Sequence, residues 1–407
     1  MAPRRTKKAE DLVVVAPDRR EHGEAVCDLG AKAFSHGGYY EMLRRCCQGY
    51  LLGSHYDWAA SRIGFLGGRL ITHFGVWGYL MRIGVARVRA GGIGMVATDG
   101  EHRRRGLMAR TVRASMAAMR DLGYDLSLLF GLEDFYDKFG YVRAWSDTIW
   151  TVRAGDLPAA GRDIQVRRFR PSYRPDIDGI YNRDNAMATG TAVRPTYPRF
   201  MHPRPMEGHL WTDARGRPAG YVVLLRRGAQ VECGEVGGDI EQALRVLAKL
   251  ARRWRCQEIR FSTFSDASPL IRRLRQGTCS AETHYVRAGG AMVATINLAS
   301  ALRKMARELE RRRAASHLAR WRGNLVVADE RERVTLCLGR SRITVREGGA
   351  SEHAIRGGAH LAQLLIGADD PAAIIEAAGM KTSGEARSLA EVLFPNQHPQ
   401  LSQRDRY

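Results

Sequence analysis

A short basic run, Arg103-Arg104-Arg105-Gly106, stands between an expected strand and an expected helix. The first amides of a helix have no partner inside the helix, and the helix dipole makes that end positive. The backbone from Arg103 to Met108 could therefore cradle a pyrophosphate, and Gly106 would let the group approach the main chain closely. The arginine side chains would add charge and forked donors. The alternative is that three arginines at an exposed helix start form only a solvated surface.

The elements that must position this run follow from the hydrophobic pattern. The stretch from Ala59 to Thr98 is β-rich and punctuated by glycine, as in a meander, and Asp99-Gly100 predicts a turn after it. From Leu107 the pattern becomes helical, and Gly123 is suited to end that helix. The apolar positions that recur at three or four residues are Met108, Val112, Met116 and Met119. A strand at Leu126 to Phe130 and a loop at Phe135 to Tyr141 are expected next.

The order strand, Arg-x-x-Gly-x-small, helix resembles the acyl-coenzyme A loop of the GNAT superfamily of N-acetyltransferases. In that family the strand before the loop holds the pantetheine arm by β-like hydrogen bonds. The resemblance gives this role to the backbone of Met95, Val96 and Ala97. It assigns the pyrophosphate to the loop Arg103, Arg104, Arg105, Gly106, Leu107 and Met108. Met108 stands where the family usually has glycine or alanine.

A closer resemblance is to the enhanced-intracellular-survival (Eis-like) acetyltransferases. It rests on His102 to Leu107, followed about 30 residues later by Phe135-Tyr136-Asp137-Lys138-Phe139-Gly140-Tyr141. The resemblance implies that Tyr136 is the general acid and that the terminal carboxylate of Tyr407 is the general base. It also implies that Gly131 and Leu132 touch coenzyme A.

The same family implies an α/β fold with mixed α+β sheets in three units. We expect an acetyl-CoA-binding GNAT domain at residues 1–152 and a degenerate GNAT-like domain at 153–288. A sterol-carrier-like domain at 289–407 would send its tail back to complete the active site. The helix expected at Asp239 follows Val236-Gly237-Gly238 and lacks the arginine–glycine motif, so the second unit is expected to bind no cofactor. The relatives imply a homo-oligomer, a homohexamer.

Other elements are predicted from periodicity and capping residues. Strands are expected at Leu12 to Ala16, Ile149 to Val152, Ile164 to Phe169, Asn324 to Val327, Val334 to Leu338 and Arg342 to Arg346. Helices are expected at Asp18 to Phe34, Tyr40 to Leu52, Asp239 to Trp254, His360 to Ile366 and Pro371 to Ala378. A further helix should begin after Asn297 as its cap and carry Leu298, Leu302, Met305 and Leu309 on one face.

Length and charge bound the remaining possibilities. The 407 residues predict two to three domains, and 64 basic minus 43 acidic residues give +21, with only seven lysines. This charge favours acidic partners. Seven cysteines without a C-x-x-C pair argue against a disulfide framework or zinc site and for a reducing compartment. The start lacks the apolar length of a signal peptide or a membrane span, and the histidines lack metal-ligand spacing, so a cytoplasmic protein without metal or membrane partner is expected.

The predicted activity is transfer of acetyl from acetyl-CoA, the co-substrate, to a primary amine on a small molecule or peptide. The acceptor would be aminoglycoside-, lysine- or polyamine-like. Four aromatic residues either wall its pocket or pack in the core: Tyr56, Trp58, Phe74 and Trp77. Four carboxylates either attract the amine or lie on the surface: Asp57, Glu133, Asp134 and Asp137. Arg406, next to the proposed base, would discourage a highly charged polyamine.

Two other functions remain open from the sequence. The sterol-carrier-like unit could bind a lipid or small molecule. The basic chain could instead associate with nucleic acid, through the basic and aromatic alternation at Val166 to Arg170 or through Arg311 to Arg322. The simpler interpretations of these segments are an ordinary strand and a solvated helix end, so a nucleic-acid partner is not expected.

Overall fold

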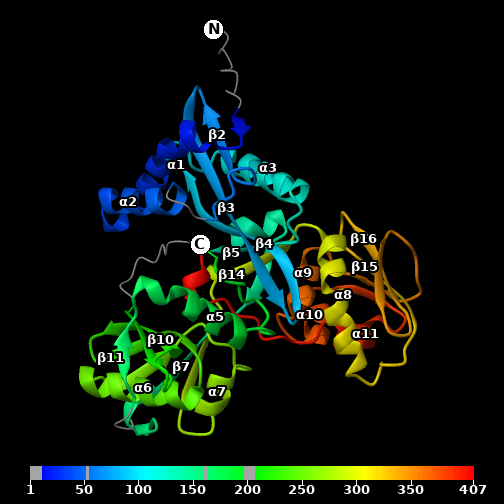
Figure 1. The fold of residues 1–407 in the computed structure, drawn as a ribbon. Coiled ribbons are helices and arrows are strands. Elements are labelled where there is room, and N and C mark those ends of the chain that lie inside the picture. Colours follow the sequence, from blue (N-terminus) through cyan, green and yellow to red (C-terminus); the bar gives the residue numbers. More distant parts are fainter. Residues whose placement is uncertain (1–11, 52–54, 160–163, 197–206) are drawn as a thin grey trace.

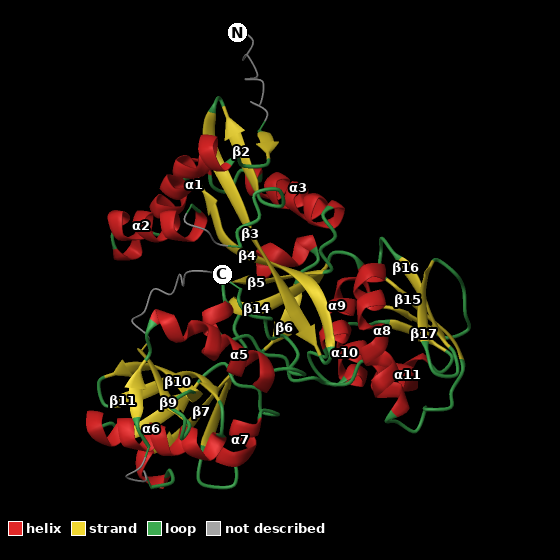
Figure 2. Ribbon diagram, viewed as in Figure 1, coloured by secondary structure: helices red, strands yellow, loops and turns green. Residues whose placement is uncertain are grey.

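The computed structural model describes residues 12–51, 55–159, 164–196 and 207–407. They form three α/β units, built on two seven-stranded sheets and one five-stranded sheet (Figures 1 and 2). The predicted fold class, mixed α/β with several sheets, is confirmed. Within these ranges, none of the helices has the length and apolar character needed to cross a membrane.

The first sheet has the strand order β1-β2-β3-β4-β5-β14-β6. Its strands are β1 (Val13–Val15), β2 (Arg62–Leu66), β3 (Arg69–Ile83), β4 (Ala86–Thr98), β5 (Leu126–Leu132), β14 (Ala288–Thr295) and β6 (Val142–Trp145). The helices of this unit are α1 (Arg19–Ala33), α2 (Tyr39–Tyr50), α3 (Leu107–Asp121) and α4 (Glu133–Tyr136). Helix α3 packs its buried Met and Val side chains with Phe74 and Val76, whereas α1 and α2 form a separate core with Ile63 and Trp77. Helices therefore cover both faces of the sheet.

The second sheet has the order β13-β7-β12-β11-β10-β9-β8. Its strands are β7 (Asp147–Arg153), β8 (Val166–Arg168), β9 (Glu207–Thr212), β10 (Pro218–Arg227), β11 (Gln230–Gly237), β12 (Glu258–Phe261) and β13 (Ser280–His284). Its helices are α5 (Arg174–Asp184), α6 (Ile240–Trp254) and α7 (Pro269–Leu274). Helix α6 buries Leu244, Leu247 and Ala251 against this sheet, as its periodicity predicts.

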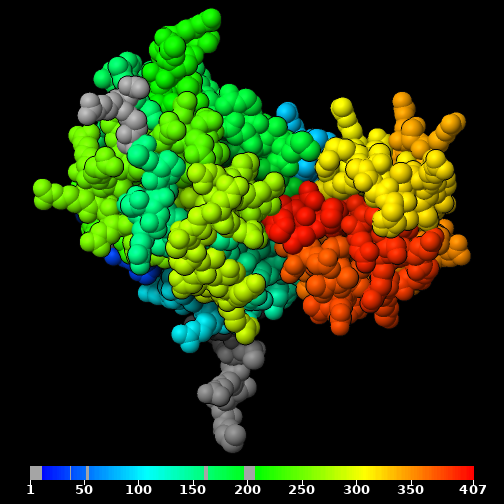
Figure 3. Space-filling view, turned by 90° about the horizontal axis from the view of Figure 1, so that it is seen from below, coloured from blue at the N-terminus to red at the C-terminus, as the bar shows by residue number. Residues whose placement is uncertain are grey.

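The third sheet has the order β17-β16-β15-β18-β19. Its strands are β15 (Gly323–Ala328), β16 (Arg333–Leu338), β17 (Ile343–Glu347), β18 (Ala354–Arg356) and β19 (Lys381–Ser383). Its helices are α8 (Leu298–Ala314), α9 (Leu361–Ile366), α10 (Pro371–Ala377) and α11 (Ala386–Leu393). The red C-terminal segment then runs back between the second and third units (Figure 3).

Two strands cross the expected domain limits. Strand β14, at the expected start of the third unit, lies between β5 and β6 of the first sheet. Strand β7, at the expected end of the first unit, lies between β12 and β13 of the second sheet. The division at residues 152 and 288 remains a prediction, and each of these strands joins one expected unit to the sheet of another.

Three local expectations are wrong for physical reasons. The segment Phe135 to Tyr141 is not an open loop, because α4 and a 3₁₀ turn occupy most of it. Asn297 precedes α8 but does not cap it with its side chain. The side-chain amide of Asn297 donates to the carbonyls of Arg120 and Tyr124. The carboxylate of Glu332 accepts from the first backbone N–H groups of α8 instead.

The arginine-rich end of α8 is also not a solvated face throughout. Arg312 and Arg313 are buried. Arg312 pairs with Glu308 at 2.7 Å and donates to the Leu393 carbonyl, and Arg313 donates to the Gly339 carbonyl. These contacts hold the third unit together and withdraw two arginines from any nucleic-acid surface.

Candidate active site

The site begins where β4 and β5 stop pairing. Their parallel register runs from Ala90↔Leu126 to Ile93↔Leu129 and ends there. Beyond that point β4 continues beside β3, and β5 continues beside β14. The edge of β4 from Gly94 onward therefore has no strand partner from β5 and faces an opening.

A β-bulge bends β4 at this point. The register with β3 shifts from Gly75↔Gly94 to His73↔Ala97, so Phe74 opposes both Met95 and Val96. Met95 has φ +46°, a left-handed conformation that side-chain-bearing residues rarely adopt.

His73 supports this strained residue. Its Nδ1 lies 2.8 Å from the Met95 carbonyl oxygen, and its Nε2 lies 2.8 Å from the Tyr56 hydroxyl. Burial lowers the pKa of His73 to about 4, so the ring is neutral at pH 7. Because a carbonyl can only accept, Nδ1 carries the proton and Nε2 accepts from Tyr56.

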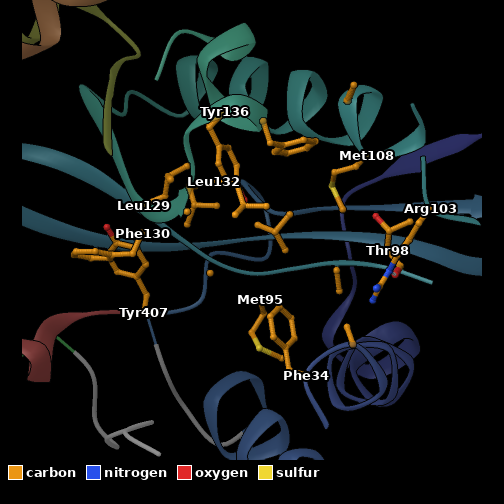
Figure 4. Close-up of a pocket in the computed structure, with 18 of the residues that line it drawn as sticks. Phe34, Met95, Thr98, Arg103, Met108, Leu129, Phe130, Leu132, Tyr136 and Tyr407 are labelled. Atoms are coloured by element: carbon orange, nitrogen blue, oxygen red, sulfur yellow. Dashed lines mark hydrogen bonds between the residues drawn. The ribbon is translucent and has the colours of Figure 1, made fainter. Parts of the chain in front are cut away.

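The opening is the mouth of a cavity of about 1050 Å³. It is lined by every residue that the sequence assigned to cofactor and catalysis: Met95, Val96, Ala97, Arg103, Arg104, Arg105, Gly106, Leu107, Met108, Gly131, Leu132, Tyr136 and Tyr407. Figure 4 shows Arg103 and Thr98 at one end, Tyr407 and Phe130 at the other, and Tyr136 reaching in between them. The fold thus brings together segments that are up to about 300 residues apart in the chain.

The arginine loop presents backbone donors to one end of the cavity. Arg104 and Gly106 have φ +59° and +74°, which turn the chain sharply into α3. No side chain in the described part of the protein caps the start of this helix. The three arginine side chains are exposed around it. This arrangement of free helix-start amides and positive charge fits a pyrophosphate.

Tyr136 enters the cavity from α4, directly after β5. Its ring packs edge-on against Phe135 and Tyr141, with centroids 4.9 and 5.7 Å apart, and is 7% exposed. A Cβ at Gly131 would overlap the Tyr136 ring, so glycine there makes room for the phenol. Burial raises the pKa of Tyr136 above its usual value of about 10. The phenol therefore remains protonated at neutral pH and can donate a proton.

The tail delivers Tyr407 to the opposite side of the opening. Its ring lies against Gly92, where any Cβ would overlap it. The carboxyl carbon would be 3.0 Å from a Cβ at Gly94. The ring also neighbours Phe130 and Tyr79, each with a centroid distance of 6.1 Å. Glycines on β4 thus provide the space in which the last residue lies.

Three of the four aromatic residues that could wall the acceptor pocket lie in the core instead. Tyr56, Phe74 and Trp77 are buried in the cores of the first unit. Asp57 accepts from the Tyr124 hydroxyl at 2.6 Å and pairs with Arg89.

The remaining expected carboxylates have structural roles as well. Glu133 pairs with Arg143, Asp134 pairs with Arg287, and Asp137 accepts from the amide of Lys138.

The cavity wall contributed by the first two helices was not predicted from the sequence. Phe34, Met42, Arg45 and Cys46 line the cavity from α1, α2 and their junction. Their only sequence signal is the amphipathic pattern of α2, which does not distinguish a core face from a cavity face. Burial raises the pKa of Cys46 to about 12, so this cysteine is a thiol and not a nucleophile at pH 7.

Comparison with known proteins defines the class of the first unit. Residues 20–144 match the family model of the acetyltransferase (GNAT) domain. The most similar relatives include an uncharacterized N-acetyltransferase of Streptomyces coelicolor, 32% identical over 155 residues. That match covers 36% of this chain and 36% of the relative, so the chain spans about a third of the curated relative it matches.

Solved structures share the fold over almost the whole chain. A GCN5-related N-acetyltransferase from Anabaena variabilis has a TM-score of 0.76 at 14% identity, covering 96% of this chain and 99% of that one. Eis1 from Mycobacterium abscessus has a TM-score of 0.70 at 16% identity, covering 98% of this chain and all of that one. At these identities the likeness concerns the fold alone.

The position of the Tyr407 ring against β4 can be tested with the Gly92→Ala variant. The added methyl would overlap the Tyr407 ring, so we expect the tail to leave the cavity. Carboxypeptidase A should then release the terminal tyrosine at least about tenfold faster than from the unchanged protein, a shift that needs only about 1.4 kcal/mol. Gly100→Ala is the control, because a Cβ there meets no atom within 4 Å. Equal release from both variants would contradict this placement.

Proposed function

We propose that the protein is an N-acetyltransferase that transfers the acetyl group of acetyl-CoA to a primary amine. The observation that carries the proposal is the convergence, in one cavity, of an uncapped helix start, an open strand edge, a buried phenol and a terminal carboxylate. The loop would hold the pyrophosphate, the edge of β4 would hold the pantetheine arm, and the thioester would lie near Tyr136.

The chemistry follows from these positions. The amine nitrogen attacks the thioester carbonyl, a C–N bond forms, and the C–S bond breaks with the electron pair leaving on sulfur. Tyr136 donates its proton to the departing thiolate, and the carboxylate of Tyr407 accepts a proton from the amine, directly or through water. A backbone N–H on the open edge of β4 would polarise the carbonyl. Alignment of the two reactants can supply about 7–11 kcal/mol of the barrier reduction.

A terminal carboxyl is a weak base at its ordinary pKa of about 3.5. In the cavity, Tyr407 lies among Phe130, Tyr79 and the β4 backbone. Burial keeps Tyr136 protonated, so the phenol can act as the acid while the carboxylate of Tyr407 accepts the proton of the amine.

We further infer that the chain follows the Eis-like plan. The full-length likeness in fold to Eis1 supports a degenerate second GNAT-like unit and a sterol-carrier-like third unit. On this plan the protein would act in the cytoplasm as a homohexamer. A lipid-binding role of the third unit stays an expectation from that plan.

Replacing Tyr136 by Phe, or deleting Tyr407, should lower kcat by about 100- to 10,000-fold, the usual contribution of a positioned acid or base. The dissociation constant for coenzyme A should change little, because neither group binds the pyrophosphate. Thiol release with a panel of amines measures kcat, and calorimetry measures binding. Tyr285→Phe is the matched control, since Tyr285 is exposed outside the cavity. Full activity in both test variants would disprove the assigned mechanism.

Changing Arg103, Arg104 and Arg105 together to Gln should weaken coenzyme A binding by about tenfold and flatten its salt dependence. The side chains are exposed, so their attraction to phosphate is screened and modest, while the backbone donors remain. Titration calorimetry at low and high salt tests this. Arg340→Gln, on the exposed surface of the third unit, should leave both quantities unchanged. Unaltered affinity in the triple variant would remove the loop from the pyrophosphate site.

A further inference from the structure

The charges around the cavity are unequal in sign. Of the described residues that line it, none is an aspartate or glutamate, and the terminal carboxylate of Tyr407 is the only anionic group. Beyond the pyrophosphate loop, the described residues that line it include the basic side chains of Arg45, Lys138 and Arg406 and the imidazole of His102. A second ammonium group in the acceptor would therefore find no side-chain carboxylate here.

The wall opposite Tyr136 is apolar. Phe34 and Met95 lie together there, across the cavity from the phenol (Figure 4). Phe130 and Leu132 of β5 add apolar side chains elsewhere in the lining, and Leu132 is 57% exposed although it is a large apolar side chain. Such a surface favours an aliphatic or aromatic body over a heavily hydrated one.

The guanidinium of Arg406 places positive charge beside the Tyr407 carboxylate, which would accept the proton of the amine. Its guanidinium lies 4.1 Å from the centre of the Phe130 ring, and its ion pair with Asp147 is long, at 3.4 Å. Its Nε is buried without a hydrogen-bond partner among the described residues. A cation entering this end of the cavity would meet the guanidinium of Arg406 beside the carboxylate of Tyr407.

We propose that the acceptor is a monoamine with an apolar body, carrying one primary amino group and no second cationic group. The proposal rests on the acetyltransferase function above and specifies its substrate class. One ammonium group can transfer its proton to the Tyr407 carboxylate and then react as a neutral amine. A second would have to remain charged against an apolar wall and near Arg406, and such unpaired burial and like-charge contact are strongly unfavourable.

The test compares two probes that differ only in a second amine, hexylamine and hexane-1,6-diamine. We expect kcat/KM for hexylamine to exceed that for the diamine by at least about tenfold. Equal values, or a preference for the diamine or spermidine, would overturn the substrate class while leaving the acetyltransferase function intact. Absence of thiol release with every amine tested would instead overturn the function itself, and the substrate class with it.

A matched pair of variants tests the cause of the discrimination. Phe34→Glu places a carboxylate on the apolar wall, and Phe34→Gln places an uncharged group of the same size there. We expect the Glu variant to raise the ratio of diamine to monoamine kcat/KM by at least about fivefold over the Gln variant. Identical ratios in the two variants would show that charge in this cavity does not select the acceptor.

An independent observation concerns how the tail is held. Arg194, Glu235 and Asp405 are buried at 6%, 4% and 1% exposure. The Arg194 guanidinium binds Glu235 through two hydrogen bonds of 2.8 and 2.6 Å. The same group binds Asp405 at 3.0 Å through Nε and at 2.9 Å through Nη2. Two residues of the second unit thus fix a residue of the tail.

Further contacts satisfy the cluster. Thr196 donates to Asp405 at 2.9 Å, Tyr221 donates to Glu235 at 2.7 Å, and the Arg194 guanidinium lies 3.5 Å from the centre of the Tyr181 ring. Burial alone would raise the pKa of Glu235, but Arg194 and Arg404 lower it well below its usual range. Glu235 therefore remains ionised, and breaking the cluster would leave a charge buried without a partner.

Asp405 lies two residues before Tyr407, and two residues span at most about 7 Å. The position of the cluster consequently limits where the terminal carboxylate can lie. The geometry points to Arg194 as a positioning residue for catalysis, acting through Asp405 on Tyr407. The second unit, which lacks the coenzyme A motif, thereby contributes to the active site of the first.

Asp405→Asn tests this role, because Arg194 keeps Glu235 as a partner and the fold should persist. We expect kcat to fall at least about tenfold, with unchanged coenzyme A affinity and faster release of Tyr407 by carboxypeptidase A, since removing one charge of a buried pair is costly. In the Arg194→Lys variant kcat should fall by a similar factor, because one ammonium group cannot replace the forked guanidinium. Asp213→Asn is the control, since Asp213 pairs with Arg217 on the exposed surface of the same unit. A kcat in the Asp405 variant equal to that of the unchanged protein would overturn the assignment. A loss of coenzyme A affinity as large as the loss of kcat would overturn it as well.

Discussion

The end of pairing between β4 and β5 is the constraint on which the site depends. Two parallel strands that share one sheet are held together up to Ile93 and Leu129 and are then drawn apart by different neighbours, β3 and β14. The bulge at Met95 supplies the bend, and neutral His73 holds its carbonyl. The opening exposes a row of main-chain groups that would otherwise be hydrogen-bonded inside the sheet. Loop, phenol and tail are each placed relative to this opening.

The resulting site is assembled from distant parts of the chain. Helices α1 and α2 give one wall, α3 and α4 give the loop and the phenol, and the last residue closes the end. Each contributor is held by its own contacts: the phenol by Phe135 and Tyr141, and the tail by Arg194 in another unit. This division lets the first unit carry an open, polar strand edge without giving up its own core.

Local features of this protein could be predicted from sequence because their causes are local. The arginine–glycine run, the periodicity of Met108, Val112 and Met116, and the first three strands of the third sheet all follow from rules that act within a few residues. The cap of α8 could not be predicted, because the carboxylate of Glu332 arrives from a later turn and displaces the expected role of Asn297. Likewise, nothing near Trp77 or Phe34 in sequence says which of these aromatics lies in a core and which faces the cavity.

The position of β14 has a consequence for how the protein is made. This strand lies between β5 and β6, yet about 140 residues separate it from β6 in the chain. During synthesis, the nascent first sheet must wait for the entire second unit to emerge, with facing edges of β5 and β6 unsatisfied in the meantime. Such exposed edges invite aggregation, and contacts of this sequence separation slow folding. A fragment ending near residue 152 would therefore be a poor autonomous folding unit, and chaperone dependence would be greatest while the middle of the chain is still on the ribosome.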